Sequence, residues 1–238
     1  MADPCLRIQE LTHSWTAQSA LFRGFSASLK TGEITALVGL SGCGKSTLLK
    51  IAAGLLKPQK GTIEGHYSRS AMVFQSPSLL PWRSAVENAV LPLELSRSPE
   101  ARERAEQMLQ KVGLHGAGDR LPHEMSGGMK MRCAIARALV VEPDLLFLDE
   151  AFSALDALTR RDVHALFLDL HQELQFTALM VTHDIEEAVS LADRVWVLKG
   201  PEASRVHEIP VSQQRPRPAT WRHSPDFGSI CMSVEAAL

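Results

Sequence analysis

The chain has 238 residues and a hydrophobic content of 45%, enough for one substantial core with a satellite lobe. A formal net charge of -2 and an isoelectric point near 6.5 lack the basic excess of a nucleic-acid-binding domain. No stretch approaches the roughly 18 to 20 consecutive apolar residues of a membrane-spanning helix. The four cysteines are scattered without zinc-ligand spacing, which indicates reduced thiols. Composition therefore argues against both a membrane span and a nucleic-acid partner.

The first predicted elements are short antiparallel strands over residues 6–33, where apolar and polar positions alternate. A buried strand at 34–38 leads through a glycine-rich turn into a helix that ends near Gly54. Residues 61–65 predict a hairpin-like return, and residues 71–74 predict another buried strand. These elements precede a region of different periodicity.

The glycine-rich turn reads GLSGCGKST over residues 39–47. Backbone N–H groups can converge there on phosphate oxygens because three positions lack a Cβ atom: Gly39, Gly42 and Gly44. The helix that follows adds its positive dipole end, Lys45 adds a full charge, and the Ser46 hydroxyl can bind Mg²⁺. Such a string also occurs by accident in ordinary turns, but here a strand precedes it and a helix follows it. The predicted ligand is a nucleoside triphosphate.

Residues 85–140 have a helical pattern, with a helix predicted to begin at a capping Ser98 and to end at Gly113. Buried strands then alternate with helices: strands at 145–148, 178–181 and 195–198, and helices at 155–174 and 185–192. The predicted fold class is α/β, a nucleotide-binding core with an inserted helical region. The core lobe is expected over 1–85 and 141–205, the helical subdomain over 86–140, and an irregular tail rich in Pro and Arg over 206–238.

Polar side chains end three of the buried strands. Ligands of open α/β sheets bind outside the carboxyl ends of the strands, so Gln75, Asp149 and His183 are expected near the phosphate loop. Asp149 can hold Mg²⁺ through its water shell, and Glu150 is placed to polarise an attacking water as general base. Gln75 offers an amide to Mg²⁺ or water, and His183 offers a donor to the terminal phosphate. Each residue alone would be an ordinary solvated strand end.

A second anion site is predicted where Ser126, Gly127 and Gly128 open the helix over 130–139. Ser126 can cap this helix, and the paired glycines leave N–H groups beside a positive dipole end. Two phosphate cradles and one apparent base suggest that the second cradle serves a nucleotide held by another copy.

Six motifs follow one another in the order seen in ABC-type ATPases, and the chain resembles that family over residues 6–198. They are similar to the Walker A, Q-loop, signature, Walker B, D-loop and H-loop: GLSGCGKST, Gln75, residues 125–129, LLFLDE, residues 153–156 and His183. The resemblance implies a P-loop NTPase (RecA-like) core with an N-terminal antiparallel β subdomain and an inserted α-helical subdomain. It also implies ATP and Mg²⁺ as cofactors, and a homodimer, or a pair with a second ABC ATPase, that sandwiches two ATP molecules head to tail.

The resemblance assigns roles to individual residues. Trp15 occupies the place of an aromatic residue that stacks on adenine, although it could be an ordinary partly buried tryptophan. The implied ATP-binding residues are Trp15, Gly39, Ser41, Gly42, Cys43, Gly44, Lys45, Ser46, Thr47, Gln75, Ser126, Gly127, Gly128 and Asp156. The implied Mg²⁺ residues are Ser46, Gln75 and Asp149, and the catalytic residues are Glu150, His183 and Lys45. Met129 and Ala151 depart from the common Gln and Pro, which puts the signature-helix contacts and the rigidity of the loop after Glu150 in doubt.

Longer segments such as LLPWRSAVENAVLPLEL and HEMSGGMKMR are similar to ATPase subunits of nitrate/sulfonate/taurine-type importers. This resemblance implies a peripheral ATP-hydrolysing subunit on the cytoplasmic face of the inner membrane, which contacts permease subunits through residues 79–83 and works with a solute-binding protein. The alternatives are an ABC exporter ATPase, a soluble ABC ATPase acting on ribosomes or DNA, and a phosphate-loop kinase in which the other motifs are incidental.

Overall fold

A computed structural model describes residues 5–16, 19–200 and 203–238 of the chain. The chain divides into two compact units, residues 1–67 with 177–238 and residues 68–176. The first unit holds β1 (Leu6–Thr16), β2 (Ser19–Leu29), β3 (Ile34–Gly39), α1 (Lys45–Ala52), β4 (Lys60–Gly65), β7 (Thr177–Val181), α6 (Ile185–Leu191), β8 (Arg194–Leu198), β9 (Ala203–Arg205), β10 (His207–Pro210), η2 (Ala219–His223) and α7 (Pro225–Ala237). The second unit holds β5 (Ser70–Val73), α2 (Ala85–Leu95), α3 (Ala101–Lys111), η1 (Pro122–Glu124), α4 (Gly127–Leu139), β6 (Leu145–Asp149) and α5 (Ala157–Leu174). These units divide the chain at other points than the predicted lobes, so that subdivision stays a prediction.

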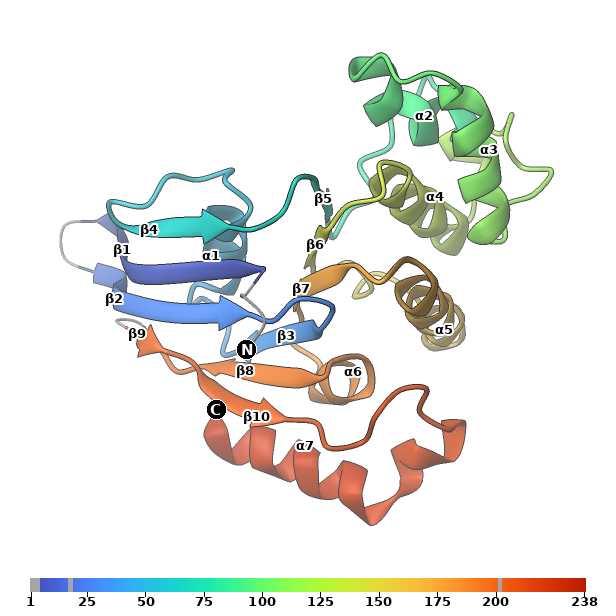
Figure 1. The fold of residues 1–238 in the computed structure, drawn as a ribbon. Coiled ribbons are helices and arrows are strands. Elements are labelled where there is room, and N and C mark those ends of the chain that lie inside the picture. The colour runs from blue at the N-terminus through green and yellow to red at the C-terminus, as the bar shows by residue number, and fades with distance from the viewer. Residues whose placement is uncertain (1–4, 17–18, 201–202) are drawn as a thin grey trace. The chain divides into compact units, whose positions relative to one another are not determined.

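Two groups of strands build the first unit (Figure 1). In one, β1 lies between β2 and β4 and is antiparallel to both, while β9 joins β2 in parallel. The predicted antiparallel region is confirmed, but the expected return at 61–65 is wrong as a hairpin, because β4 pairs with the distant β1. In the other group, β3 is parallel to both β7 and β8, and β10 is antiparallel to β8. Apolar residues make up most of β7 and of β3, as expected of parallel strands covered on both faces. The α/β fold class is confirmed.

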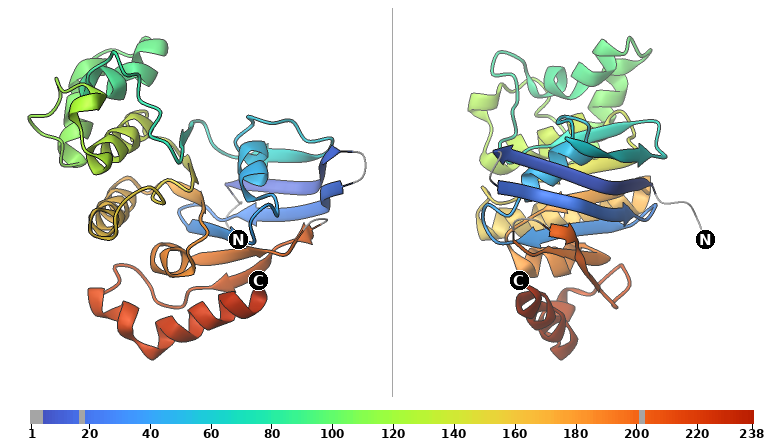
Figure 2. Two further views of the ribbon diagram at one scale, coloured as in Figure 1. Left: turned by 180° about the vertical axis from the view of Figure 1, so that it is seen from behind. Right: turned by 90° about the vertical axis from the view of Figure 1, so that its left-hand side faces the viewer.

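The segment predicted as an irregular tail contains β10, η2 and the 13-residue helix α7, so that prediction is wrong. Ser224 caps α7 by accepting a hydrogen bond from the Phe227 N–H at 3.2 Å, and Pro225 stands at the first helical position. Phe227 and Val234, seven residues apart, are buried on one face of the helix. Figures 1 and 2 show α7 running beside α6 and β10, with which it makes contacts. The Pro- and Arg-rich composition obscured this apolar spacing.

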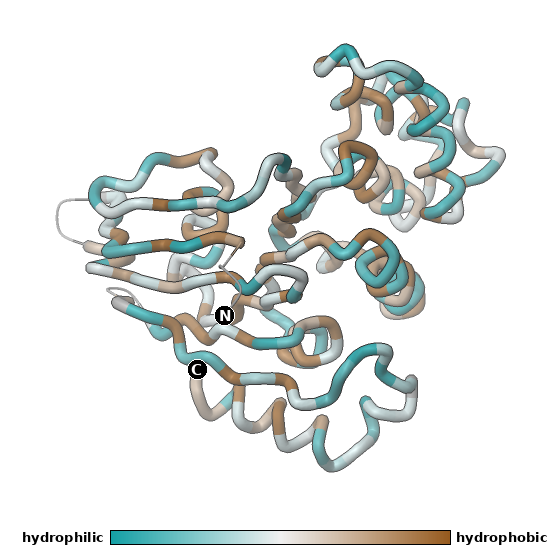
Figure 3. Tube along the Cα trace, in the orientation of Figure 1, coloured by the Kyte–Doolittle hydropathy of each residue, from teal (hydrophilic) through white to brown (hydrophobic). Residues whose placement is uncertain are grey.

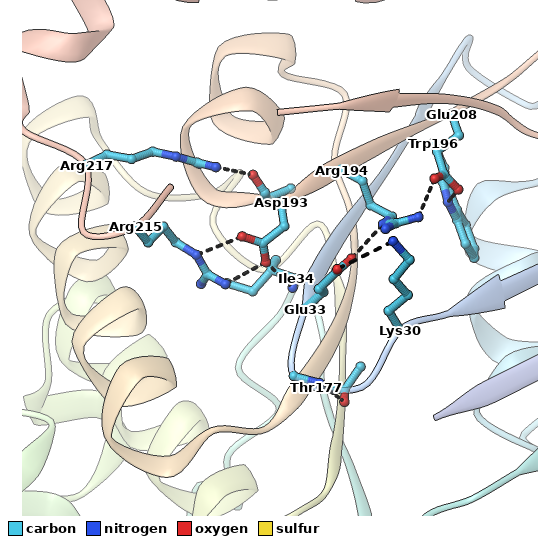
Figure 4. Close-up of polar contacts among 12 residues, drawn as sticks. Lys30, Glu33, Ile34, Thr177, Asp193, Arg194, Trp196, Glu208, Arg215 and Arg217 are labelled. Atoms are coloured by element: carbon cyan, nitrogen blue, oxygen red, sulfur yellow. Dashed lines mark hydrogen bonds and ion pairs between the residues drawn. The ribbon is translucent and has the colours of Figure 1, made fainter. Parts of the chain in front are cut away.

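Charged side chains attach the tail to the rest of the first unit, as Figure 4 shows. The Asp193 carboxylate accepts hydrogen bonds from the Ile34 N–H at 2.8 Å and from Nε and Nη2 of Arg215 at 3.0 and 2.5 Å. Nearby, Arg194 donates both to Glu33, at 2.7 Å, and to Glu208. Arg215, which belongs to the basic stretch that predicted an irregular tail, therefore supplies the cation for the Asp193 carboxylate just before β8.

Arg217 makes a second attachment of the tail. Its guanidinium donates to the carbonyl oxygens of Val189, Ser190 and Ala192 at 2.7 to 3.0 Å. A helix leaves its last carbonyl groups without intrahelical partners, so Arg217 completes the end of α6. The guanidinium also lies 4.9 Å from the centre of the Trp221 ring, and burial lowers the pKa of Arg217 to about 10.

The second unit combines the parallel pair β5 and β6 with helices α2 to α5. Its helices carry hydrophobic and hydrophilic stretches in alternation (Figure 3). The helix predicted between Ser98 and Gly113 is present as α3, which buries Ala105, Met108 and Leu109 on one face. The predicted cap at Ser98 is wrong. Glu100, with a left-handed φ of 56°, is the N-cap residue, and the Ser98 hydroxyl donates instead to the Pro99 carbonyl. The connecting loop therefore places Ser98 outside the helix start, where its hydroxyl cannot cap α3.

Candidate functional site

The phosphate loop joins β3 to α1 in the first unit. Gly42 and Gly44 have φ values of 79° and 104°, a left-handed conformation that favours glycine. A Cβ atom on Gly44 would lie 2.9 Å from Cζ of Phe22, and one on Gly39 would lie 2.7 Å from both Sγ of Cys43 and the Leu198 oxygen. Phe22 of β2 and Leu198 of β8 therefore leave no room for a side chain at Gly44 or Gly39. Ser41 and Gly42 are exposed.

Lys45 supplies the positive charge of this loop. It is only 7% exposed, and its Nζ donates to the carbonyl oxygens of Gly39 and Leu40 at 2.8 and 3.0 Å. The lysine side chain therefore folds back over the loop. Gly44, the N-cap residue of α1, contributes no side-chain cap, so no capping side chain covers the start of the helix. Backbone donors at a helix N-terminus and one ammonium group fit the phosphates of a nucleotide.

His183 lies at the same edge of the sheet as the phosphate loop, as predicted for this pair. Leu37 of β3 is opposite Val181 of β7, and the Thr182 N–H donates to the Leu37 oxygen at 3.2 Å. His183 follows directly and is exposed. Its neighbour Asp184 caps α6 by accepting from the Glu187 N–H. The cap fixes the turn that presents the histidine.

Trp15 stands at the end of β1, with 65% of its surface exposed. The buried His13 ring meets it edge-on, with ring centres 5.2 Å apart at 88°. Phe22 is opposite His13 in the β1–β2 ladder and contacts Gly44 of the phosphate loop. The exposed indole is free to receive a planar group on this side of the first unit.

The second unit carries the acidic residues. Val73 of β5 is opposite Leu148 of β6, so Gln75 follows one strand end and Asp149 and Glu150 occupy the other. The structure brings Gln75 close to the loop after Glu150: its Nε2 donates to Oγ of Ser153 at 3.3 Å, and that hydroxyl donates to the Glu150 carbonyl at 2.8 Å. Gln75 is exposed and both acids are half-buried.

The oxygen donors of these strand ends suit Mg²⁺. A carboxylate and an amide oxygen are hard ligands, and Mg²⁺ is commonly held by one or two carboxylates together with waters and phosphates. Within the described part of the chain, no cluster of three or more His, Cys, Asp or Glu side chains could hold a metal ion by itself. The carboxylate and amide oxygens at these strand ends are ligands of the kind that Mg²⁺ combines with water and phosphate oxygens.

The signature segment opens α4, also in the second unit. The Ser126 hydroxyl accepts from the Met129 N–H at 3.2 Å and caps the helix as predicted. A Cβ atom on the exposed Gly127 would meet nothing within 4 Å, whereas one on the buried Gly128 would lie 2.4 Å from Cγ2 of Thr159. The two neighbouring glycines therefore differ in their surroundings. At Gly128 the packing against Thr159 leaves no space for a Cβ atom, whereas the described residues leave the space beside Gly127 empty.

Asp156 has a structural task beside this contact. Its side chain caps α5 by accepting from the Thr159 N–H at 3.1 Å, and hydrogen bonding by Thr159 holds the pKa of Asp156 below its usual range. The family resemblance assigned Asp156 to the D-loop and to ATP binding, and this helix cap was not predicted. Thr159, which touches both this cap and Gly128, was missed.

Sequence reasoning also missed two side chains that support the segment after Gln75. The buried Asn88 accepts from the Leu80 N–H at 2.7 Å and donates to the carbonyl oxygens of Leu80, Arg83 and Ser84. Arg137 of α4 donates to the Pro77 and Ser78 oxygens, both at 2.8 Å. This framework leaves Trp82 72% exposed. A single asparagine within the apolar run of α2 was the available signal.

Residues 22–153 match the family of ABC transporter proteins, and this match spans more than half of the chain. The chain belongs to the ABC transporter family. It is 44% identical over 201 residues to the "Aliphatic sulfonates import ATP-binding protein SsuB 1" of Mesorhizobium japonicum, with 82% of this chain and 76% of the relative covered. It is also 43% identical to the "Nitrate import ATP-binding protein NrtC" of Synechococcus elongatus, with 84% and 32% covered.

Solved structures agree with this family assignment. The cbiO1 structure from Clostridium perfringens, part of the ABC transporter complex cbiONQ, superimposes with a TM-score of 0.78 at 30% identity, covering 88% of this chain and 90% of that one. The predicted fold and the predicted resemblance to nitrate and sulfonate importers are confirmed. As a member of the family, the chain is an ATP-hydrolysing subunit of a membrane transporter. None of the helices in the described residues has the length and apolar content to cross a bilayer.

Proposed function

We propose that this chain is the ATPase subunit of an importer for sulfonate- or nitrate-like anions, bound to the cytoplasmic face of the inner membrane. The observation that carries the proposal is the 44% identity over 201 residues to a sulfonate import ATP-binding protein, together with 43% identity to a nitrate one. The same likeness favours import over export and over a ribosomal or DNA partner. The exposed Trp82, held on the framework of Asn88, supports contact with a permease through residues 79–83. A solute-binding protein would complete the complex.

The proposed chemistry rests mainly on positioning and charge. Residues 39–47 and Lys45 would bind the phosphates of ATP, and Trp15 would stack on its base. Mg²⁺, when bound by Ser46, Asp149 and Gln75, would neutralise phosphate charge. The Glu150 carboxylate would orient and polarise the attacking water, and His183 would donate a hydrogen bond toward the terminal phosphate.

Hydrolysis would require two copies, or this chain and a second ABC ATPase. Ser126, Gly127 and Gly128 would then face the ATP bound to the partner's phosphate loop. The open surroundings of Gly127 at the start of a 13-residue helix support this role, because nothing in the described part of the chain fills that space. ATP binding would close the pair and hydrolysis would reopen it, which would drive alternating access in the permease.

Replacement of Glu150 by Gln tests the assignment of the base. We expect the hydrolysis rate to fall by about 10²- to 10⁴-fold, while ATP binding persists and light scattering detects a stable ATP-bound dimer. Glu103→Gln, on the exposed surface of α3, is the matched control and should leave the rate unchanged. A normal rate in Glu150→Gln would refute the assignment of Glu150.

The solute is tested by deleting the corresponding gene and measuring uptake. We expect the loss of alkanesulfonate or nitrate uptake, restored by the wild-type chain and not by Glu150→Gln. Unchanged uptake of both anions would refute the proposed solute class, whatever the outcome for hydrolysis.

A further inference from the structure

The loop that follows β6 is held by aromatic rings within the second unit. Phe152 is 1% exposed, and its ring meets the His164 ring at a centroid distance of 4.8 Å and an interplanar angle of 76°. The Phe167 ring also meets the Phe152 ring, at a centroid distance of 5.8 Å and an interplanar angle of 62°. Edge-to-face geometry of this kind is the favoured arrangement of aromatic pairs. Both partners of Phe152 belong to α5, so the helix clamps the loop two residues beyond Glu150.

The backbone at Glu150 needs such a clamp. Its φ of 47° lies in the left-handed region, which a residue with a Cβ atom adopts only when its surroundings enforce it. Ala151 follows directly and, unlike the proline common at this position, has no ring that fixes its φ angle. The turn is closed by Ser153, whose N–H and hydroxyl both donate to the Glu150 carbonyl, at 3.1 and 2.8 Å. Phe152 lies inside this turn, so the position of its ring determines where the turn lies.

We infer that His164 is a positioning residue for hydrolysis, because its ring holds Phe152 and thereby the strained turn that orients the Glu150 carboxylate. This inference rests on the proposed role of Glu150 as the base. His164 acts on that carboxylate through Phe152 and the turn, and it neither contacts the nucleotide nor transfers a proton. Its contribution belongs to the rate of the chemical step and not to the binding of ATP.

The same helix contains a matched pair that serves as an internal control. His171, 3% exposed, meets Phe176 with ring centres 4.9 Å apart at 80°, close to the geometry of His164, 4% exposed, with Phe152. Residue types, burial and ring angles are therefore alike in the two pairs. The aromatic partner of His171, however, leads directly into the strand after α5, and its ring reaches Phe152 only through Phe167, which lies 5.8 Å from each of the two rings.

The experiment compares His164→Leu with His171→Leu in the full chain. Both substitutions remove one edge-to-face contact from the same core, so we expect similar falls in Tm. His164→Leu should lower kcat for ATP hydrolysis by about three- to tenfold and leave KM within about twofold. His171→Leu should leave kcat within about twofold of the wild-type value. His164→Phe, which restores a ring edge without an ionisable nitrogen, should recover kcat and retain the wild-type pH profile.

Three results would overturn the inference: equal losses of kcat in the two leucine variants, a loss confined to KM, or a shifted pH profile with no recovery in His164→Phe. If His164→Leu does not fold, Phe152→Leu replaces it and should show the same fall in kcat. Glu150→Gln separates the two proposals. A normal rate in that variant refutes the base, whereas a lost rate with equal effects at His164 and His171 refutes only the positioning role.

Discussion

The two adjacent glycines of the signature segment allow packing to be separated from nucleotide contact. In Gly128→Ala, the new Cβ atom would lie 2.4 Å from Cγ2 of Thr159, so the two atoms cannot both stay where they are. Thr159 is tethered by its own N–H to Asp156, which limits its retreat. Overpacking of a core typically costs about 1–3 kcal/mol, which in a chain of this length lowers Tm by about 2–12 °C. Thr159→Ser removes Cγ2 and should restore most of that loss in the double variant.

Gly127→Ala should behave in the opposite way. Its Cβ atom meets nothing within 4 Å, so the stability should be unchanged or raised by up to about 1 kcal/mol. The methyl group would nevertheless stand where a phosphate oxygen must approach the N–H groups at the start of α4. We therefore expect hydrolysis to fall by about 10²-fold, the usual cost of losing one preorganised donor.

Calorimetry and steady-state ATPase assays, at protein concentrations that permit pairing, distinguish the two effects. A Gly127→Ala variant that hydrolyses ATP at the wild-type rate would refute the proposed contact with the partner's nucleotide. A Gly128→Ala variant that Thr159→Ser fails to rescue would refute the steric explanation.

Three further substitutions probe other parts of the chain. Trp15→Ala should raise KM for ATP by about tenfold with little change in kcat, since stacking on a base is worth about 1–3 kcal/mol, and an unchanged KM would exclude stacking. Arg217→Ala removes a charged donor from the last carbonyl groups of α6 and should lower the free energy of unfolding by about 2 kcal/mol, seen as a lower Tm and faster proteolysis of α7. Proteolytic resistance equal to that of the wild type would contradict this role of Arg217. Burial raises the pKa of Cys133 from 9.0 to about 12, so its stabilising contribution is complete below pH 9 and is lost as the pH rises toward 12. Cys133→Ala should therefore lose stability less steeply above pH 9 than the wild type, and parallel denaturation curves would argue against this.

The parts of the fold that the sequence predicts are those determined by local chemistry. The phosphate loop is recognisable because left-handed glycines, a lysine and a helix start must occur together within residues 39–47. The strand ends at Gln75, Asp149 and His183 are recognisable because each apolar run stops at a polar side chain. Each of these signals lies within a few residues along the chain.

Contacts between distant segments could not be predicted in this way. The closeness of Gly128 to Thr159 and the support that Asn88 gives to the loop at Leu80 depend on how helices pack. The helix α7 was not predicted because prolines and arginines outweighed its widely spaced apolar residues. The start of α3 was predicted wrongly because the connecting loop places Glu100, and not Ser98, at the N-cap. Ala151 likewise suggested a loose loop, since the ring contacts of Phe152 are invisible along the chain.

The attachment at Asp193 gives the last part of the chain a significance that its composition hides. One carboxylate receives the first N–H of β3 and the guanidinium of Arg215, so the strand that leads to the phosphate loop begins beside a charge neutralised from the tail. Shortening the protein at Pro210 would strand that negative charge next to a buried backbone. The C-terminal segment thus provides the positive charge that balances Asp193 at the start of β3, and a truncated protein would lack it.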